Sequence, residues 1–135
     1  MSKAAELLFD TNALVDIYRG QASIKDRFES ILDGSLLPYV SVITEAELWR
    51  GLCSGEVERH ELILSQFISL PLDSDAARLA GTWMQKYAAS GLGWMDALIS
   101  ATGKIAGLPV LTRDKRLLKV LSSETSFDLY SLIQS

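Results

Sequence analysis

The fold follows from LLFDTNAL, residues 7–14. Residues 6–9 predict a short buried strand, and residues 11–18 predict a helix that ends at Arg19 and Gly20. Asp10 stands where the strand passes into the helix, so its carboxylate follows buried sequence rather than an exposed loop. An unpaired carboxylate in such surroundings gives up its charge. The stretch therefore predicts a strand–helix unit whose acid needs a compensating partner.

Strands and helices alternate along the rest of the chain. Apolar spacing and turn residues predict further helices at 24–32, 44–49, 57–67, 73–90, 95–106 and 114–121, and strands at 38–41, 68–72, 109–112 and 127–130. The alternation predicts an α/β fold with three α/β/α layers around a central, mostly parallel sheet. Because the chain has 135 residues and no linker, we expect one domain over residues 1–135. Ligands in such folds bind at the carboxyl ends of the strands, where the strand order reverses.

Three more acids are expected at that edge of the sheet. Glu47 falls in the first turn of the helix after the second strand, Asp96 begins a later helix, and Asp114 follows the fourth strand. Each acid also has an ordinary explanation. Asp10 and Asp114 suit helix N-caps, and Asp96 suits the positive end of a helix dipole. Glu47 fits a capping box opened by Thr44.

The apolar sequence around Asp96 favours a functional site over these ordinary explanations. Trp94 and Met95 precede it, apolar residues follow at 97–99, and small residues at 100–103 would let the helix approach the sheet. Carboxylates gathered at one edge would repel one another, and a divalent cation offsets that repulsion. Since Mg²⁺ prefers oxygen ligands and keeps several waters, a few acids suffice. We therefore expect a magnesium site built from Asp10, Glu47, Asp96 and Asp114.

The composition is that of an acidic globular protein. Hydrophobic residues make up 48% and charged residues 22%, and 13 basic against 17 acidic residues give a net charge of −4. No apolar run approaches the length that crosses a bilayer, and residues 1–6 lack the hydrophobic region of a signal peptide. We therefore expect a cytoplasmic protein without membrane association. Its affinity for nucleic acid would depend on cations at the acidic edge, because phosphate affinity normally comes from Lys and Arg.

Cysteine and histidine chemistry is nearly excluded. Cys53 is the only cysteine, so neither an internal disulfide nor a cysteine zinc site can form. We expect a buried or half-buried reduced thiol, which fits the cytoplasm. His60, the only histidine, lies in the charged stretch EVERHE, residues 56–61, and is expected on a solvated helix face.

Four motifs in order carry a family resemblance. They are LFDTNAL at 8–14, SVITEAEL at 41–48, DALISAT at 96–102 and LTRD at 111–114. Together they resemble the motifs of PIN-domain nucleases, over essentially the whole chain. The resemblance implies that Asp10, Glu47, Asp96 and Asp114 are the catalytic and metal-binding acids, and that Asn12 and Thr112 orient the site. Many members carry Asn where this chain has Asp114.

Chains of this length are similar to VapC-like toxins of type II toxin–antitoxin systems. That resemblance implies a Mg²⁺- or Mn²⁺-dependent endoribonuclease, a homodimer, and a cognate antitoxin that blocks the site. The expected chemistry is metal-assisted hydrolysis of an RNA phosphodiester, which needs no side-chain nucleophile.

Basic residues near the motifs are candidates for contact with the RNA backbone. They are Arg19, Arg50, Arg113, Lys115 and Arg116, and a solvated helix face is the ordinary alternative. Trp49 and Trp94 lie near site acids and could stack a base, but we expect both in the core.

Other classes of protein remain open at this point. A phosphatase of the haloacid-dehalogenase type also begins with an Asp after its first strand, but it needs a second Asp where this chain has Asn12. A phospho-receiver module needs an acidic pair and a late Lys, and neither is visible. A PIN-fold RNA-processing nuclease without an antitoxin and a non-catalytic PIN-fold binding module are the nearer alternatives.

Overall fold

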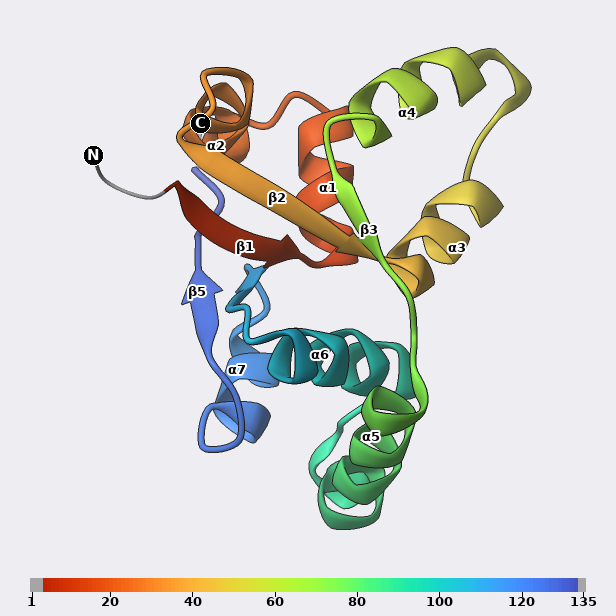
Figure 1. Cartoon of the computed structure of the whole chain (residues 1–135), viewed down its shortest axis with the longest axis vertical. Coiled ribbons are helices and arrows are strands. Elements are labelled where there is room, and N and C mark those ends of the chain that lie inside the picture. The colour runs from red at the N-terminus through yellow and green to blue at the C-terminus, as the bar shows by residue number, and fades with distance from the viewer. Residues whose placement is uncertain (1–3, 134–135) are drawn as a thin grey trace.

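The computed structural model describes residues 4–133, in which helices alternate with five strands (Figure 1). The elements are β1 (Ala5–Phe9), α1 (Thr11–Tyr18), α2 (Ala22–Leu32), β2 (Leu36–Ser41), α3 (Val42–Arg50), η1 (Ser54–Glu56), α4 (Val57–Leu64), β3 (Ile68–Leu70), α5 (Ser74–Tyr87), η2 (Ala88–Ser90), α6 (Trp94–Ala106), β4 (Val110–Thr112), α7 (Lys115–Leu121) and β5 (Phe127–Leu129). Within this part of the chain, no helix is long and apolar enough to cross a membrane.

The sheet is parallel throughout, with the strand order β3-β2-β1-β4-β5. Leu8 of β1 lies between Tyr39 of β2 and Val110 of β4. Strands β2 and β3 are added on one side of β1, and β4 and β5 are added on the other side. The strand order therefore reverses between β1 and β4, which makes their carboxyl ends the expected binding edge.

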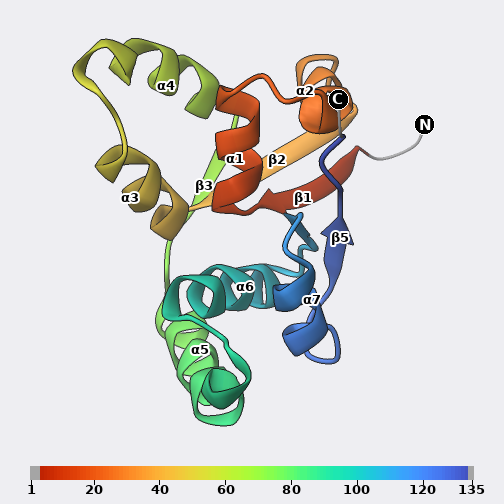
Figure 2. The same ribbon diagram turned by 180° about the vertical axis from the view of Figure 1, so that it is seen from behind.

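Alternate residues of β1 face two different helical layers. Leu7 and Phe9 pack among residues of α1, α2 and β2, whereas Leu8 packs against Ile99 of α6. Both views of the ribbon place α1, α2 and α4 on one side of the sheet and α5, α6 and α7 on the other (Figures 1 and 2). The predicted α/β/α fold is confirmed, and the sheet is all-parallel rather than mostly parallel.

Helix α3 begins earlier than the sequence predicted. Strand β2 passes into it without a loop, and the Ser41 hydroxyl caps it by accepting the Ile43 N–H at 3.0 Å. The predicted start at Thr44 was wrong, and so was the capping box of Thr44 and Glu47. Glu47 lies in the second turn of α3 rather than the first, which leaves its carboxylate free for contacts with other elements.

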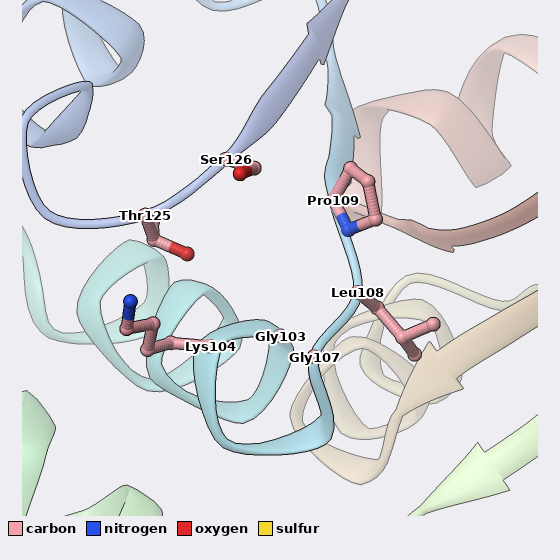
Figure 3. Close-up of a pocket in the computed structure, with 7 residues that line it drawn as sticks. All are labelled: Gly103, Lys104, Gly107, Leu108, Pro109, Thr125 and Ser126. Carbon is pink, nitrogen blue, oxygen red and sulfur yellow. The ribbon is translucent and has the colours of Figure 1, made fainter.

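Helix α6 approaches the sheet closely at Gly103. A Cβ placed on this residue would lie 2.8 Å from Val110 Cγ2, 3.1 Å from the Leu108 carbonyl oxygen and 3.3 Å from Leu8 Cδ2. Gly103 also lines a pocket between the end of α6 and the segment before β5, which Figure 3 shows in close-up. This pocket lies at the amino end of β4, opposite the edge that the site acids occupy.

The Gly103→Ala substitution is expected to destabilise the protein by about 1–3 kcal/mol, because the added methyl group overpacks the helix–sheet contact. Gly81 in α5 is the matched control, since a Cβ there meets nothing within 4 Å. Gly81→Ala is expected to stabilise the helix by up to about 1 kcal/mol. Urea unfolding of both variants measures the difference, and equal effects would contradict the close approach.

Candidate active site

Two of the predicted acids lie at the ends of adjacent strands and cap the helices that follow. Asp10 caps α1, where its Oδ1 accepts the Ala13 N–H at 2.8 Å, and it is 6% exposed. Asp114 caps α7, and its Oδ1 accepts the N–H groups of Arg116 and Leu117 at 2.9 and 3.1 Å. The cap of Asp114 uses only Oδ1, so its second oxygen is left for another role, whereas the Asp10 carboxylate also contacts the Thr112 hydroxyl.

The other two acids come from helices that contact each other at the same edge. The Thr11 hydroxyl donates to Glu47 Oε1 at 2.6 Å, and it lies 3.1 Å from the Thr44 hydroxyl. Asp96 lies half-buried in the first turn of α6. Among residues 4–133, no hydrogen bond to its carboxylate is found. Both oxygens of the Asp96 carboxylate are therefore without a hydrogen-bond donor among the described residues.

The charges of the predicted acids act on one another. Burial raises the pKa of Asp10 to about 6, and the charges of Asp96 and Asp114 add to that rise. Hydrogen bonds from the Thr112 hydroxyl and a backbone N–H lower the pKa of Asp10 by less. Burial also raises the pKa of Asp96, followed by the charges of Asp114 and Glu47. The structure thus brings the predicted acids close enough for their charges to oppose the ionisation of Asp10 and Asp96.

The donor set fits a hard divalent cation. Carboxylate oxygens are the ligands that Mg²⁺ and Mn²⁺ prefer, and mutual repulsion among acids is what a bound cation relieves. Within the described part of the chain, no three His, Cys, Asp or Glu side chains are already arranged as a metal-binding group. The acids therefore lie near one another at the edge of the sheet, but their side chains are not already arranged around a single ion position.

The residues predicted to orient the site differ in their surroundings. Thr112 is fully buried, and its hydroxyl accepts the Asp114 N–H at 3.0 Å and lowers the pKa of Asp10. Asn12 is exposed, and no side-chain hydrogen bond to it is found within residues 4–133. Sequence reasoning missed Thr11, the residue after Asp10, whose hydroxyl donates a hydrogen bond to Glu47. Its place in the first turn, next to a site acid, was the only signal.

Two of the predicted basic residues line hollows that site acids also line. Arg19 lines a hollow that also includes Glu47. Arg116 lines a second hollow with Asp96 and Asp114. Both arginines are exposed. The acidic edge therefore has a cation beside each of its two hollows.

The remaining basic candidates lie in other surroundings. The Arg113 guanidinium is turned inward, where its Nε donates to Asp16 Oδ2 at 2.9 Å. Arg50 lines a different hollow between α3 and α4, together with Trp49. Lys115 is exposed at the start of α7. Sequence reasoning did not single out Asp16, although a charge among the inward-facing residues of α1 was a visible signal.

Three expectations about side-chain burial were wrong. His60 is 4% exposed, because α4 packs it against α1 with its Nδ1 2.6 Å from the Tyr18 hydroxyl. Cys53 is exposed in the connection after α3 rather than buried. Trp49 and Trp94 are 58% and 52% exposed, so neither is a core residue. These residues lie in connections and helix faces whose packing depends on distant parts of the chain.

The fold and site together define a class of protein. The family described as the PIN domain matches residues 7–121, and the chain belongs to this family, as its motifs indicated. The chain is 33% identical over 111 residues to "Ribonuclease VapC10" of Mycobacterium tuberculosis, which covers 78% of this chain and 80% of that protein.

Solved structures share the fold. The toxin–antitoxin complex from Klebsiella pneumoniae matches with a TM-score of 0.68 and 27% identity, over 87% of this chain and 92% of that one. FitAcB from Neisseria gonorrhoeae matches with a TM-score of 0.70 and 28% identity, over 90% and 96%. These values extend the family likeness to nearly the whole described chain.

Proposed function

We propose that the chain is a metal-dependent endoribonuclease and the toxin of a toxin–antitoxin pair. The observation that carries the proposal is the placement of Asp10, Glu47, Asp96 and Asp114 at the edge of the sheet where the strand order reverses. Support comes from the relatives, since one is named a ribonuclease and another is described as a toxin–antitoxin complex. A ribonuclease acting on the cell's RNA would work in the cytoplasm.

In this proposal the four carboxylates hold one or two Mg²⁺ or Mn²⁺ ions. When bound, the ion lowers the pKa of a water and stabilises charge on the phosphodiester. Asp96 offers a carboxylate without a hydrogen bond among residues 4–133, Asp114 offers the oxygen that its cap leaves free, and Asp10 offers a carboxylate that also contacts the Thr112 hydroxyl. Thr11 holds Glu47 in place through its 2.6 Å hydrogen bond. The chain's own residues thus bind the cation and fix the distances between its ligands.

The RNA backbone would cross the acidic edge between two arginines. Arg19 lies beside Glu47 and Arg116 beside Asp96 and Asp114, so each could take a phosphate on one side of the cleaved bond. Lys115 is exposed nearby and could add a third cation. The Arg113 guanidinium is paired with a buried acid, which takes it out of the set that contacts RNA. Arg50 lines a hollow that none of the four acids lines, and it is a weaker candidate.

The proposed partner is an antitoxin whose tail carries Arg or Lys. A basic side chain at the acidic edge would pair with Asp10 and Asp96 by charge-assisted hydrogen bonds, where the metal would otherwise bind. A symmetric homodimer would present two such edges. The second candidate function is a PIN-fold RNA-processing nuclease without an antitoxin, which would use the same site for the same chemistry.

The proposal is tested by metal-dependent cleavage. The purified protein should cleave structured RNA with Mg²⁺ or Mn²⁺, lose that activity in EDTA, and recover it when metal is restored. Since binding to the folded site alone stabilises the protein, the free energy of unfolding should rise by about 2.7 kcal/mol at a metal concentration of about 100 times Kd. Cleavage that survives EDTA would contradict the mechanism.

A further inference from the structure

A buried ion-pair cluster lies behind the acidic edge. Asp16 is 1% exposed, and its Oδ2 accepts the Arg113 Nε–H at 2.9 Å and the Tyr130 hydroxyl at 2.5 Å. The three residues come from α1, from the turn between β4 and α7, and from the segment after β5. One carboxylate therefore joins three parts of the chain that are distant in sequence.

The cluster holds the turn that carries two site residues. Arg113 lies between Thr112 and Asp114, so fixing its side chain fixes the backbone on both sides. The Thr112 carbonyl accepts the Tyr130 N–H at 3.1 Å, and the Thr112 hydroxyl accepts the Asp114 N–H at 3.0 Å. Burial and the hydrogen bond to Asp16 raise the pKa of the Tyr130 phenol, and the charge of Asp10 adds to the rise, which places the cluster next to the site.

We propose that Asp16 is a positioning residue that, through Arg113 and Tyr130, sets the place of Asp114 relative to Asp10 for the divalent cation. The inference rests on the proposed metal-dependent function. Asp16 lies on α1, the helix that Asp10 begins, and Arg113 directly precedes Asp114. The ion pair thus links the two elements that carry these acids. Asp10 follows β1 and Asp114 follows β4, the two strands between which the strand order reverses.

A role in stability alone explains the cluster poorly. Taking the Asp16 carboxylate out of water costs about as much free energy as its attraction to the half-buried Arg113 guanidinium returns, so the pair adds little net stability. The ion pair fixes the relative positions of the residues that it joins, because the planar guanidinium donates in a fixed direction. Groups behind metal ligands change metal affinity by about 10- to 100-fold when they are mutated.

The test compares two tyrosines that each donate to a carboxylate. Tyr130→Phe removes the hydroxyl that bonds Asp16, and Tyr87→Phe removes one that bonds Glu124 at 2.6 Å, between α5 and the connection from α7 to β5. Asp16→Asn keeps the shape of the central side chain and removes its charge. Mn²⁺ affinity is measured for the parent and each variant by electron paramagnetic resonance, together with kcat and KM for RNA and the free energy of unfolding.

We expect Asp16→Asn and Tyr130→Phe to weaken Mn²⁺ binding by about tenfold or more and to lower kcat more than KM. Tyr87→Phe should leave Mn²⁺ affinity unchanged within about twofold, whatever its effect on unfolding. Equal Mn²⁺ affinity of the parent and Tyr130→Phe, or an equal loss in Tyr87→Phe, overturns the inference. The tyrosine pair decides the question even where Asp16→Asn does not fold. A parent that binds no Mn²⁺ overturns the proposed function itself.

Discussion

Asp96→Asn is expected to lower the rate of RNA cleavage by more than about 100-fold. Mutating residues that only support metal ligands already lowers metal affinity or activity by about 10- to 100-fold, and Asp96 is proposed as a ligand itself. The amide keeps the shape of the carboxylate and removes its charge. In the absence of metal, the same variant should unfold at a higher temperature than the parent at neutral pH. Burial and the charges of Asp114 and Glu47 raise the pKa of Asp96, so its ionised form opposes folding there.

Opposite changes in activity and stability distinguish a metal ligand from a structural acid. The parent should arrest growth when it is expressed alone, a neighbouring antitoxin gene should relieve the arrest, and Asp96→Asn should be harmless at equal expression. A variant that loses stability together with activity would show that Asp96 serves the fold. If the parent is harmless at expression confirmed by immunoblot, the RNA-processing alternative replaces the toxin.

The metal-free protein is expected to lose about 2 kcal/mol of stability through Asp10 as the pH rises from about 4 to about 7. Burial raises the pKa of Asp10 from 3.8 to about 6 in the folded protein. The folded state therefore keeps its proton up to about pH 6, whereas the unfolded chain releases it near 3.8. The contribution is fully present below the lower value and is lost as the pH rises through the higher one.

Asp10→Asn isolates this effect. Asn caps a helix as well as Asp does, so the variant should keep α1 and lose the part of the fall in stability that Asp10 contributes. Saturating Mg²⁺ should also remove the fall in the parent, because a bound cation favours the ionised carboxylate. Urea unfolding at several pH values measures the difference in unfolding free energy between parent and variant. A difference that is the same at pH 4 and pH 7 would contradict the raised pKa of Asp10.

The elements of the fold could be predicted where local chemistry decides them. Helix α1 was placed correctly at both ends because Asp10 caps its start and Gly20, with a φ of +66°, ends the turn after it. The start of α3 was missed because Val42 and Ile43 are β-branched and continue the pattern of strand β2. Only the cap at Ser41 separates the strand from the helix.

The four acids could be predicted for a similar reason. A parallel sheet sends every strand end to one edge, so acids at strand ends and helix starts meet there whatever the details of packing. The burial of His60 could not be predicted, because it depends on the contact of α4 with Tyr18 of α1. Arg113 was expected to face RNA for the same reason, since nothing local shows that its partner is Asp16.

The pairing of β1 with β4 has a consequence for the order of events during synthesis. Leu8 and Val110 lie side by side in the sheet, although about a hundred residues separate them in the chain. A nascent polypeptide can form the β1–β2–β3 half early, but the turn that carries Asp114 reaches it only after β4 has left the ribosome. The edge that carries Asp10 and Asp114 is therefore completed only after β4 has paired with β1.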